Sequence, residues 1–197
     1  YEALLTETDL DQNTAIGHEA LMAATTADNN LAIGYLAARS STIGNNNTAV
    51  GFKALEVNTA ANNTAVGFEA LTTNNTGHSN VSVGYQSQYA NTIGIHNVGI
   101  GLNALYANSA GDRNVAVGSR ALTDFNVTST ADTYNTAVGY DAGARVTTGT
   151  LNTLVGGLAG DAITTGERNV IAGHSAGGAL TVGGSNTCLL YTSPSPR

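Results

Sequence analysis

The chain has 197 residues, of which only 11% are charged, and its 7 Lys and Arg against 14 Asp and Glu give a formal net charge of −7. Seven scattered basic residues cannot form the basic face that a nucleic-acid-binding protein needs, so a nucleic-acid partner is excluded. No apolar run approaches the roughly 18 residues of a membrane-spanning helix, which excludes membrane insertion of this sequence. The hydrophobic fraction of 42% is rich in Ala and contains no Trp, which indicates a narrow core.

A repeat runs along almost the whole chain. In each unit an Asn is followed four positions later by Gly, and successive Asn are separated by sixteen or seventeen positions, with one longer spacing of twenty-one. We call these positions the asparagine column and the glycine column. The asparagine column comprises Asn13, Asn30, Asn47, Asn63, Asn80, Asn97, Asn114, Asn135, Asn152, Asn169 and Asn186. The glycine column comprises Gly17, Gly34, Gly51, Gly67, Gly84, Gly101, Gly118, Gly139, Gly156 and Gly173. Self-similarity at a fixed period is typical of a solenoid, so we interpret both columns as structural.

The three residues after each Asn predict a short strand, as in residues 48–50 and 115–117. The first and third residues are mostly β-branched and share one face of the strand. The second residue is Ala, Ser or Gly in eight of the ten full units, with Leu154 and Ile171 as exceptions. Small residues and the glycine column permit close approach by another backbone. We therefore expect this bare face to be a subunit interface, and the chain to form a homotrimer.

A second Gly lies fourteen positions after the Asn in seven units and predicts a turn in which Gly supplies a positive φ. These residues are Gly44, Gly77, Gly94, Gly111, Gly149, Gly166 and Gly183. The Ala-Leu pairs between the strand and this turn, such as Ala54-Leu55, predict a second short strand or a corner. Each unit then forms one coil of an all-β parallel β-solenoid of about ten coils, stacked about 4.8 Å apart. We expect the asparagine column chiefly to form turns, with a ladder of amide hydrogen bonds as a supplement.

Aromatic residues occur five positions after the Asn in half of the full units. They are Tyr35, Phe52, Phe68, Tyr85 and Tyr140. Such a column could meet sugar rings or a partner surface, but we favour packing inside a corner against the Leu that follows three positions later. His78 and His96 lie in turns of successive units, so we expect them to be close together and solvated rather than bound to a metal ion.

The longest unit, which separates Asn114 from Asn135, contains an insertion. Residues 123–134 read TDFNVTSTADTY and are four positions longer than the standard segment. Insertions in solenoids form loops, often on a binding face, so Phe125 and Tyr134 are candidate binding residues. A plain surface bulge is the equal alternative. Glu69 has no acidic partner in the adjacent units, and no other catalytic set interrupts the repeat. We therefore predict no catalytic residue, no metal and no cofactor.

The two ends of the chain differ in character. Tyr1-Glu2-Ala3-Leu4 correspond to Phe-Glu-Ala-Leu at residues 68–71, so we expect the chain to begin inside a unit and residues 1–187 to form one solenoid region that is a fragment. Residues 188–197, CLLYTSPSPR, leave the repeat and hold the only Cys and both Pro. This segment resembles translated adapter sequence, and we expect a non-native tail. A single Cys also excludes an intrachain disulfide.

The motif Asn-Thr-Ala-Val-Gly-Phe-x-Ala-Leu, which recurs across residues 13–187, resembles the head repeats of trimeric autotransporter adhesins. The seventeen-residue spacing and the Asn-Asn-Thr-Gly turns are similar to repeats of bacteriophage tail-fibre proteins. The resemblance implies a parallel β-roll or β-helix in which three chains form a rigid shaft or an adhesive head. The period is longer than in the adhesin heads.

The function that we expect from this resemblance is non-enzymatic. The chain would be a structural and adhesive segment of an extracellular fibre, either a virion tail fibre or a bacterial surface adhesin, that meets a host cell-surface receptor or glycan. The alternative is a β-helical polysaccharide-degrading enzyme. An ice-binding solenoid is disfavoured, because Thr occupies the first strand position in only five of the ten full units.

Overall fold

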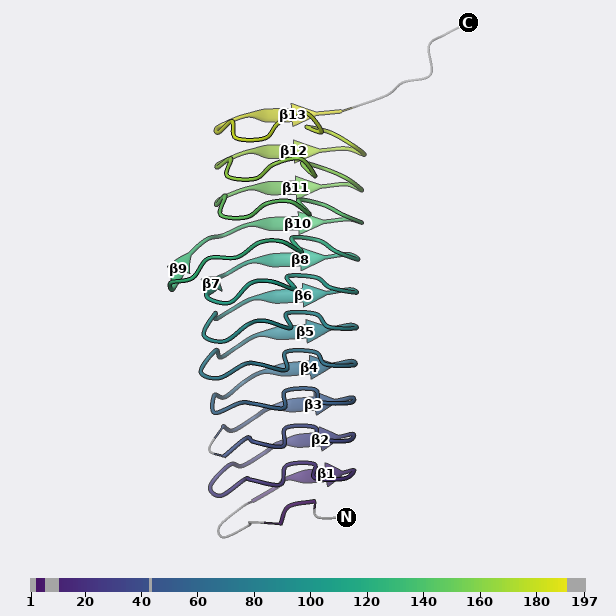
Figure 1. Cartoon of the computed structure of the whole chain (residues 1–197), viewed down its shortest axis with the longest axis vertical. Coiled ribbons are helices and arrows are strands. Elements are labelled where there is room, and N and C mark those ends of the chain that lie inside the picture. Colours follow the sequence, from purple (N-terminus) through teal and green to yellow (C-terminus); the bar gives the residue numbers. More distant parts are fainter. Residues whose placement is uncertain (1–2, 6–10, 43, 191–197) are drawn as a thin grey trace, which may run out of the picture.

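The protein is a single column of stacked coils (Figure 1). The computed structural model describes residues 3–5, 11–42 and 44–190. Eleven strands of three residues form one sheet: β1 (Thr14–Ile16), β2 (Leu31–Ile33), β3 (Thr48–Val50), β4 (Thr64–Val66), β5 (Val81–Val83), β6 (Val98–Ile100), β8 (Val115–Val117), β10 (Thr136–Val138), β11 (Thr153–Val155), β12 (Val170–Ala172) and β13 (Thr187–Leu189). Two further strands, β7 (Gly111–Asp112) and β9 (Ala131–Asp132), pair with each other beside it.

The sheet is parallel throughout, and equal positions of the repeat lie over one another. Ala49 is paired with Ala65 and Ala65 with Ser82, and the register continues across the long unit, where Ala116 is paired with Ala137. No helix occurs among the described residues. The prediction of an all-β parallel β-solenoid, with about ten coils that follow the seventeen-residue repeat, is confirmed, as is the strand in each unit.

The bare face of the strands points into the coil. Within the eleven-stranded sheet, the second strand residue is buried in every strand from β2 to β12, whereas the first and third residues are half-buried or exposed. Ala49, Ala65 and Ala116 are fully buried within their own chain. Our expectation that this column is a subunit interface is therefore wrong. In the coils where a Leu points inward from the opposite corner, such as Leu55 and Leu71, the space left beside the sheet holds only a small residue.

The glycine column brings neighbouring coils of the same chain together. Its residues have φ between 122° and 140°, a region that side-chain-bearing residues rarely adopt. A Cβ atom added to Gly67 would lie 2.3 Å from the carbonyl oxygen of Gly84. The predicted close approach is real, but the approaching backbone belongs to the next coil.

The segment after each glycine is a corner without a strand or a helix. The residues two and four positions after the glycine have positive φ, for example Glu69 at 51° and Leu71 at 53°. Leu55, Leu71 and Leu105 point inward from this corner and are fully buried. The corner alternative that we gave for the Ala-Leu pairs is therefore correct.

One coil in the middle has a polar core. Hydrophobic clusters fill the coils from Ala20 to Leu71 and from Ala104 to Ala176. Between them Ser82, Ser87 and Gln88 are fully buried, and the Gln88 side chain donates to the Val81 carbonyl at 2.7 Å. The larger Gln88 is accommodated because the next coil has Gly99 in place of Ala, where a Cβ would lie 2.9 Å from the Gln88 Cγ.

The exceptional residues Leu154 and Ile171 have a matching explanation. In these late coils Gly143, Gly160 and Gly177 replace the inward Leu of the corner, and all three have positive φ. A Cβ on Gly143 would lie 2.6 Å from the Leu154 side chain. The bulky side chain has moved from the corner to the strand, so the core volume is kept.

The asparagine column forms a buried ladder. The Asn97 Oδ1 accepts a hydrogen bond from the Asn114 amide at 2.9 Å, and the Asn97 Nδ2 donates to the Gly111 carbonyl at 2.8 Å. The same pattern recurs at Asn63. Its Oδ1 accepts from the Asn80 amide at 3.0 Å, and its Nδ2 donates to the Gly77 carbonyl at 2.9 Å. The positive φ lies on the residue before the Asn, as in His96 at 58°. We had expected turn formation to be the main role of the asparagine column. Its main role is instead the ladder of hydrogen bonds between coils.

The turn glycines also differ from the prediction. Gly77 does not have a positive φ, yet an added Cβ would lie 2.5 Å from both the Gly94 carbonyl oxygen and the Asn74 Oδ1. Close packing explains the glycine here. Asn74 belongs to a second buried ladder that was not predicted from the sequence, formed by Asn58, Asn74 and Asn91. The Asn74 Nδ2 donates to the Asn58 Oδ1 at 2.8 Å, and Asn91 repeats this bond to Asn74 at 2.8 Å.

Candidate functional site

A stack of aromatic rings runs along the outside of the early coils. We call His18, Tyr35, Phe52, Phe68 and Tyr85 the aromatic ladder. Ring centroids of successive members are 4.9 to 5.4 Å apart, and their planes differ by 5° to 18°. Tyr35 and Tyr85 are each 48% exposed. The interpretation that these rings pack inside a corner is wrong, because the buried residue of the corner is the Leu three positions later.

The ladder offers ring edges to its surroundings. Since each inner ring is stacked between two others, its faces are covered and its outer edge is exposed. A sugar ring that binds by stacking needs a free aromatic face, which the inner rings do not have. The ladder is therefore better suited to an apolar partner that packs against a ridged surface.

The outer face of the sheet lies next to the ladder in the sequence and carries no charge. Its first and third strand residues are Thr, Val, Leu, Ile or Ala in all eleven strands. Ile16, Ile100 and Val155 on this face are among the exposed large hydrophobic residues. Exposed apolar area of this extent marks an interaction surface.

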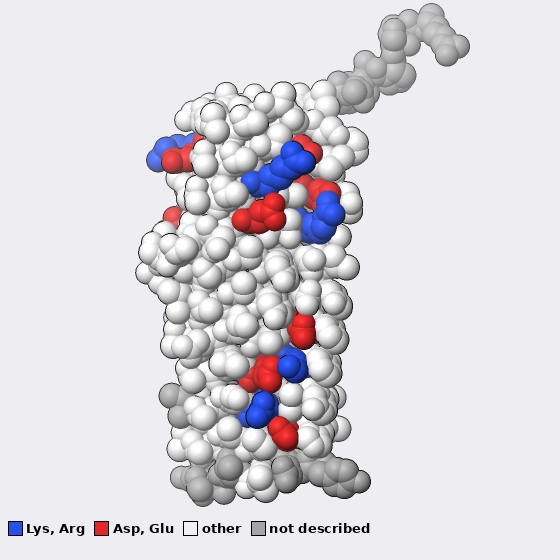
Figure 2. Space-filling view, viewed as in Figure 1, with Lys and Arg blue, Asp and Glu red and all other residues white. Residues whose placement is uncertain are grey.

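On the face shown in Figure 2, charged side chains gather beside the early coils and beside the late coils. In the early group Arg39 forms two ion pairs. Its Nε lies 3.0 Å from the Glu19 Oε2, and its Nη1 lies 3.5 Å from the Glu56 Oε1. In the late group the Arg120 Nε donates to the Asp141 Oδ1 at 2.7 Å, and this hydrogen bond raises the pKa of the Arg120 guanidinium above its usual value. These charges neutralise one another along the column and support packing of the coils.

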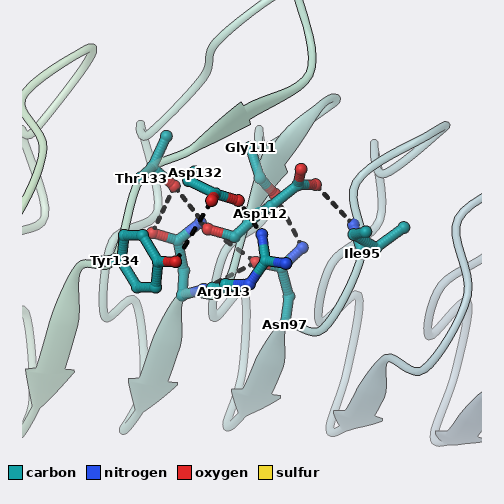
Figure 3. Close-up of polar contacts among 9 residues, drawn as sticks. Ile95, Asn97, Gly111, Asp112, Arg113, Asp132, Thr133 and Tyr134 are labelled. Carbon is teal, nitrogen blue, oxygen red and sulfur yellow. Dashed lines mark hydrogen bonds and ion pairs between the residues drawn. The ribbon is translucent and has the colours of Figure 1, made fainter.

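The insertion forms a bulge at one edge of the column (Figure 1). Its strand β9 is paired with β7 of the preceding coil. The buried Thr133 anchors the end of the bulge, because its hydroxyl lies 2.8 Å from the Asp112 carbonyl and 2.9 Å from the Asn114 Oδ1. The Asp112 side chain in turn accepts from the Ile95 amide at 2.8 Å (Figure 3).

The two candidate binding residues have different environments. Phe125 is fully buried in the core of the late coils, so it stabilises the coil and we no longer propose it as a contact residue. Tyr134 is 47% exposed, and its hydroxyl donates to the Asp132 Oδ2 at 3.2 Å. Arg113 forms an ion pair with Asp132 and lies 5.8 Å from the Tyr134 ring centroid (Figure 3).

Arg113 and Asp132 were not singled out from the sequence. A signal was present for Arg113, because it precedes Asn114 as Tyr134 precedes Asn135, and equal positions of consecutive coils lie side by side. Asp132 falls inside the insertion, and its pairing with Asp112 of the preceding coil became evident only from the register of β7 and β9. The cluster of Arg113, Asp132 and Tyr134 is a fixed polar surface beside the bulge.

The structure also places the two turn histidines and Glu69. The rings of His78 and His96 are 5.3 Å apart, which confirms that they are neighbours. Within the described part of the chain no three His, Cys, Asp or Glu side chains gather as metal ligands would. Glu69 accepts a hydrogen bond from the Gln86 Nε2 at 2.7 Å. The same residues contain no apolar helix of membrane-spanning length.

The segment 188–197 is described only in part. Cys188 and Leu189 belong to β13, which is paired with β12, and Cys188 packs against the late core. Residues 191–197 of the expected tail lie outside the described residues, as do residues 1–2, 6–10 and 43.

No family model matches the chain, and neither a curated protein nor a solved structure matches it. The resemblance to adhesin heads and tail fibres thus remains a resemblance in motif. What the structure establishes is a parallel β-solenoid of about ten coils.

Proposed function

We propose that this chain is a rigid, non-enzymatic segment of an extracellular fibre, a virion tail fibre or a bacterial surface adhesin, that assembles as a homotrimer and holds a receptor- or glycan-binding surface away from its base. The observation that supports this proposal best is the unbroken parallel register of eleven strands. Every coil is bonded to the next through its strand, its corner and its Asn side chain. A column built in this way resists bending, as a shaft must.

The length of the column is suited to this role. Eleven strands stacked about 4.8 Å apart extend over roughly 50 Å. The bulge with Arg113, Asp132 and Tyr134 offers a polar surface at one side, and many copies of such weak contacts act together when chains are assembled. Host attachment through this surface is part of the proposal.

Small-angle X-ray scattering with multi-angle light scattering tests the proposal. We expect a rod-like particle whose mass is three times that of the chain. A flexible or globular monomer would contradict the shaft. The alternative function, polysaccharide degradation, is tested by incubating the chain with bacterial surface polysaccharides and measuring the release of reducing ends, and we expect none.

A further inference from the structure

We propose that copies of this chain pack side by side, parallel and in axial register, through an apolar stripe. We define the apolar stripe as the first and third residues of the eleven-stranded sheet together with the aromatic ladder and Leu102. The inference rests on the proposed function in that it supplies the contact between the copies of the shaft. It names the surface and the orientation, which the proposed function leaves open.

Composition distinguishes the stripe from the rest of the surface. The sheet positions of the stripe include no Asp, Glu, Lys or Arg, although the chain has a net charge of −7. Two copies can therefore meet here without bringing like charges together. The exposed Ile16, Ile100 and Leu102, at 57%, 38% and 46%, are residues that water solvates poorly.

The size of the stripe agrees with a stable contact. Its length is about 50 Å for eleven strands, and the three residues of each strand give a width of about 10 Å. The sheet part alone is on the order of 500 Å², and the aromatic ladder brings the stripe closer to the roughly 800 Å² per partner of a standard interface. This area is at the upper end of the roughly 300–600 Å² of the largest apolar patch on a typical monomer.

The axial period identifies the partner. The rings of the aromatic ladder form ridges every 4.9 to 5.4 Å along the column. Successive coils are stacked about 4.8 Å apart, whereas the turns of an α-helix repeat about every 5.4 Å, and a helix would therefore be half a period out of step after about four coils. A second copy of this chain has the same period and can interdigitate along the whole stripe.

The uneven distribution of rings determines the orientation. The early coils carry five successive rings, whereas the equivalent positions of the late coils are Ser119, Tyr140, Gly157 and His174. By reversal of the strand order, antiparallel copies would keep Phe68 opposite Tyr140 and Tyr35 opposite His174, but would place Phe52 opposite Gly157 and Tyr85 opposite Ser119. Parallel copies place every ring of the ladder beside a ring, which buries more apolar area.

Cysteine cross-linking of the full chain tests surface and orientation together. In a Cys188→Ser background, Val50→Cys on β3 should give disulfide-linked dimers under mild oxidation. Val155→Cys on β11, the position that reversal would place opposite Val50, should link only to itself. The two sites are six coils apart, about 29 Å along the axis, so parallel neighbours cannot join them.

Mixing differently tagged Val50→Cys and Val155→Cys chains gives the decisive result. Linked pairs of equal sites with few mixed pairs support the inference, and a predominance of mixed pairs overturns it. Asn75→Cys, an exposed site away from the stripe, is the control and should link at least fivefold less. Equal linking of all three sites also overturns the inference.

A second measurement separates this inference from the proposed function. The double variant Phe52→Ser, Phe68→Ser changes only exposed parts of the stripe, and unchanged circular dichroism checks that it folds. We expect its mass in solution to fall to that of one chain. An oligomer of unchanged mass overturns the stripe and leaves the shaft intact. A wild-type chain that is monomeric but rod-like overturns the packing while the shaft remains.

Discussion

Removal of one rung from the asparagine ladder should destabilise the whole column. In Asn97→Ala the fully buried Asn114 amide loses its acceptor, and the Asn114 Nδ2 loses a bond of 3.1 Å. The Gly111 carbonyl keeps a partner, because the Asn108 Nδ2 also donates to it at 3.0 Å. One orphaned buried donor costs about 1–3 kcal/mol and two further lost bonds about 0.5–1 kcal/mol each. We therefore expect the free energy of unfolding to fall by about 2–5 kcal/mol.

Urea denaturation followed by circular dichroism measures this loss. The matched control is Asn75→Ala, which removes an exposed Asn from an adjacent part of the column and should cost less than about 0.5 kcal/mol. Hydrogen exchange of the Asn114 amide adds a local measurement, since that proton should exchange much faster in Asn97→Ala. If both variants lose the same stability and the Asn114 amide stays protected, the ladder does not hold the coils together.

Three further substitutions test the packing. Gly84→Ala should prevent folding or strongly lower the melting temperature, because its Cβ would lie 2.5 Å from the Gly101 carbonyl oxygen at a φ of 136°. Gly157→Ala is the control and should be tolerated, because the nearest atom to its Cβ, in the His174 side chain, would be 3.5 Å away. Gly99→Ala should destabilise the fold, because the added Cβ would contact Gln88. The triple variant Ser87→Ala, Gln88→Leu, Gly99→Ala should recover this stability, because it recreates the packing of Ala104, Leu105 and Ala116 in the next coil. A triple variant less stable than Gly99→Ala would refute this explanation. Phe125→Ala should cost about 3–5 kcal/mol in thermal or urea unfolding, as expected for a large buried ring, and Tyr134→Ala less than about 1 kcal/mol; equal costs would contradict the burial of Phe125.

Part of the candidate site was accessible from the sequence. The equal spacing of Tyr35, Phe52, Phe68 and Tyr85 predicts a column, because equal positions must stack in a solenoid. The exposure of that column was not predictable, since aromatic rings are as common in cores as on contact surfaces. The bulge was located by its extra residues, but which of its two aromatic residues points inward depends on the closure of one particular coil.

The sequence by itself determined the period, the strand in each unit and the parallel register, because a solenoid must place the same residue over the same residue in every coil. Tertiary structure alone decided which face is inside. Strand alternation places Thr48 and Val50 on one face and Ala49 on the other, but it does not determine which of the two faces is buried. The choice depends on the corner, where residues as different as Glu69 and Leu71 adopt positive φ and fold the chain back onto the small residues. Neither Glu nor Leu favours a positive φ, so no local sequence pattern predicts this corner.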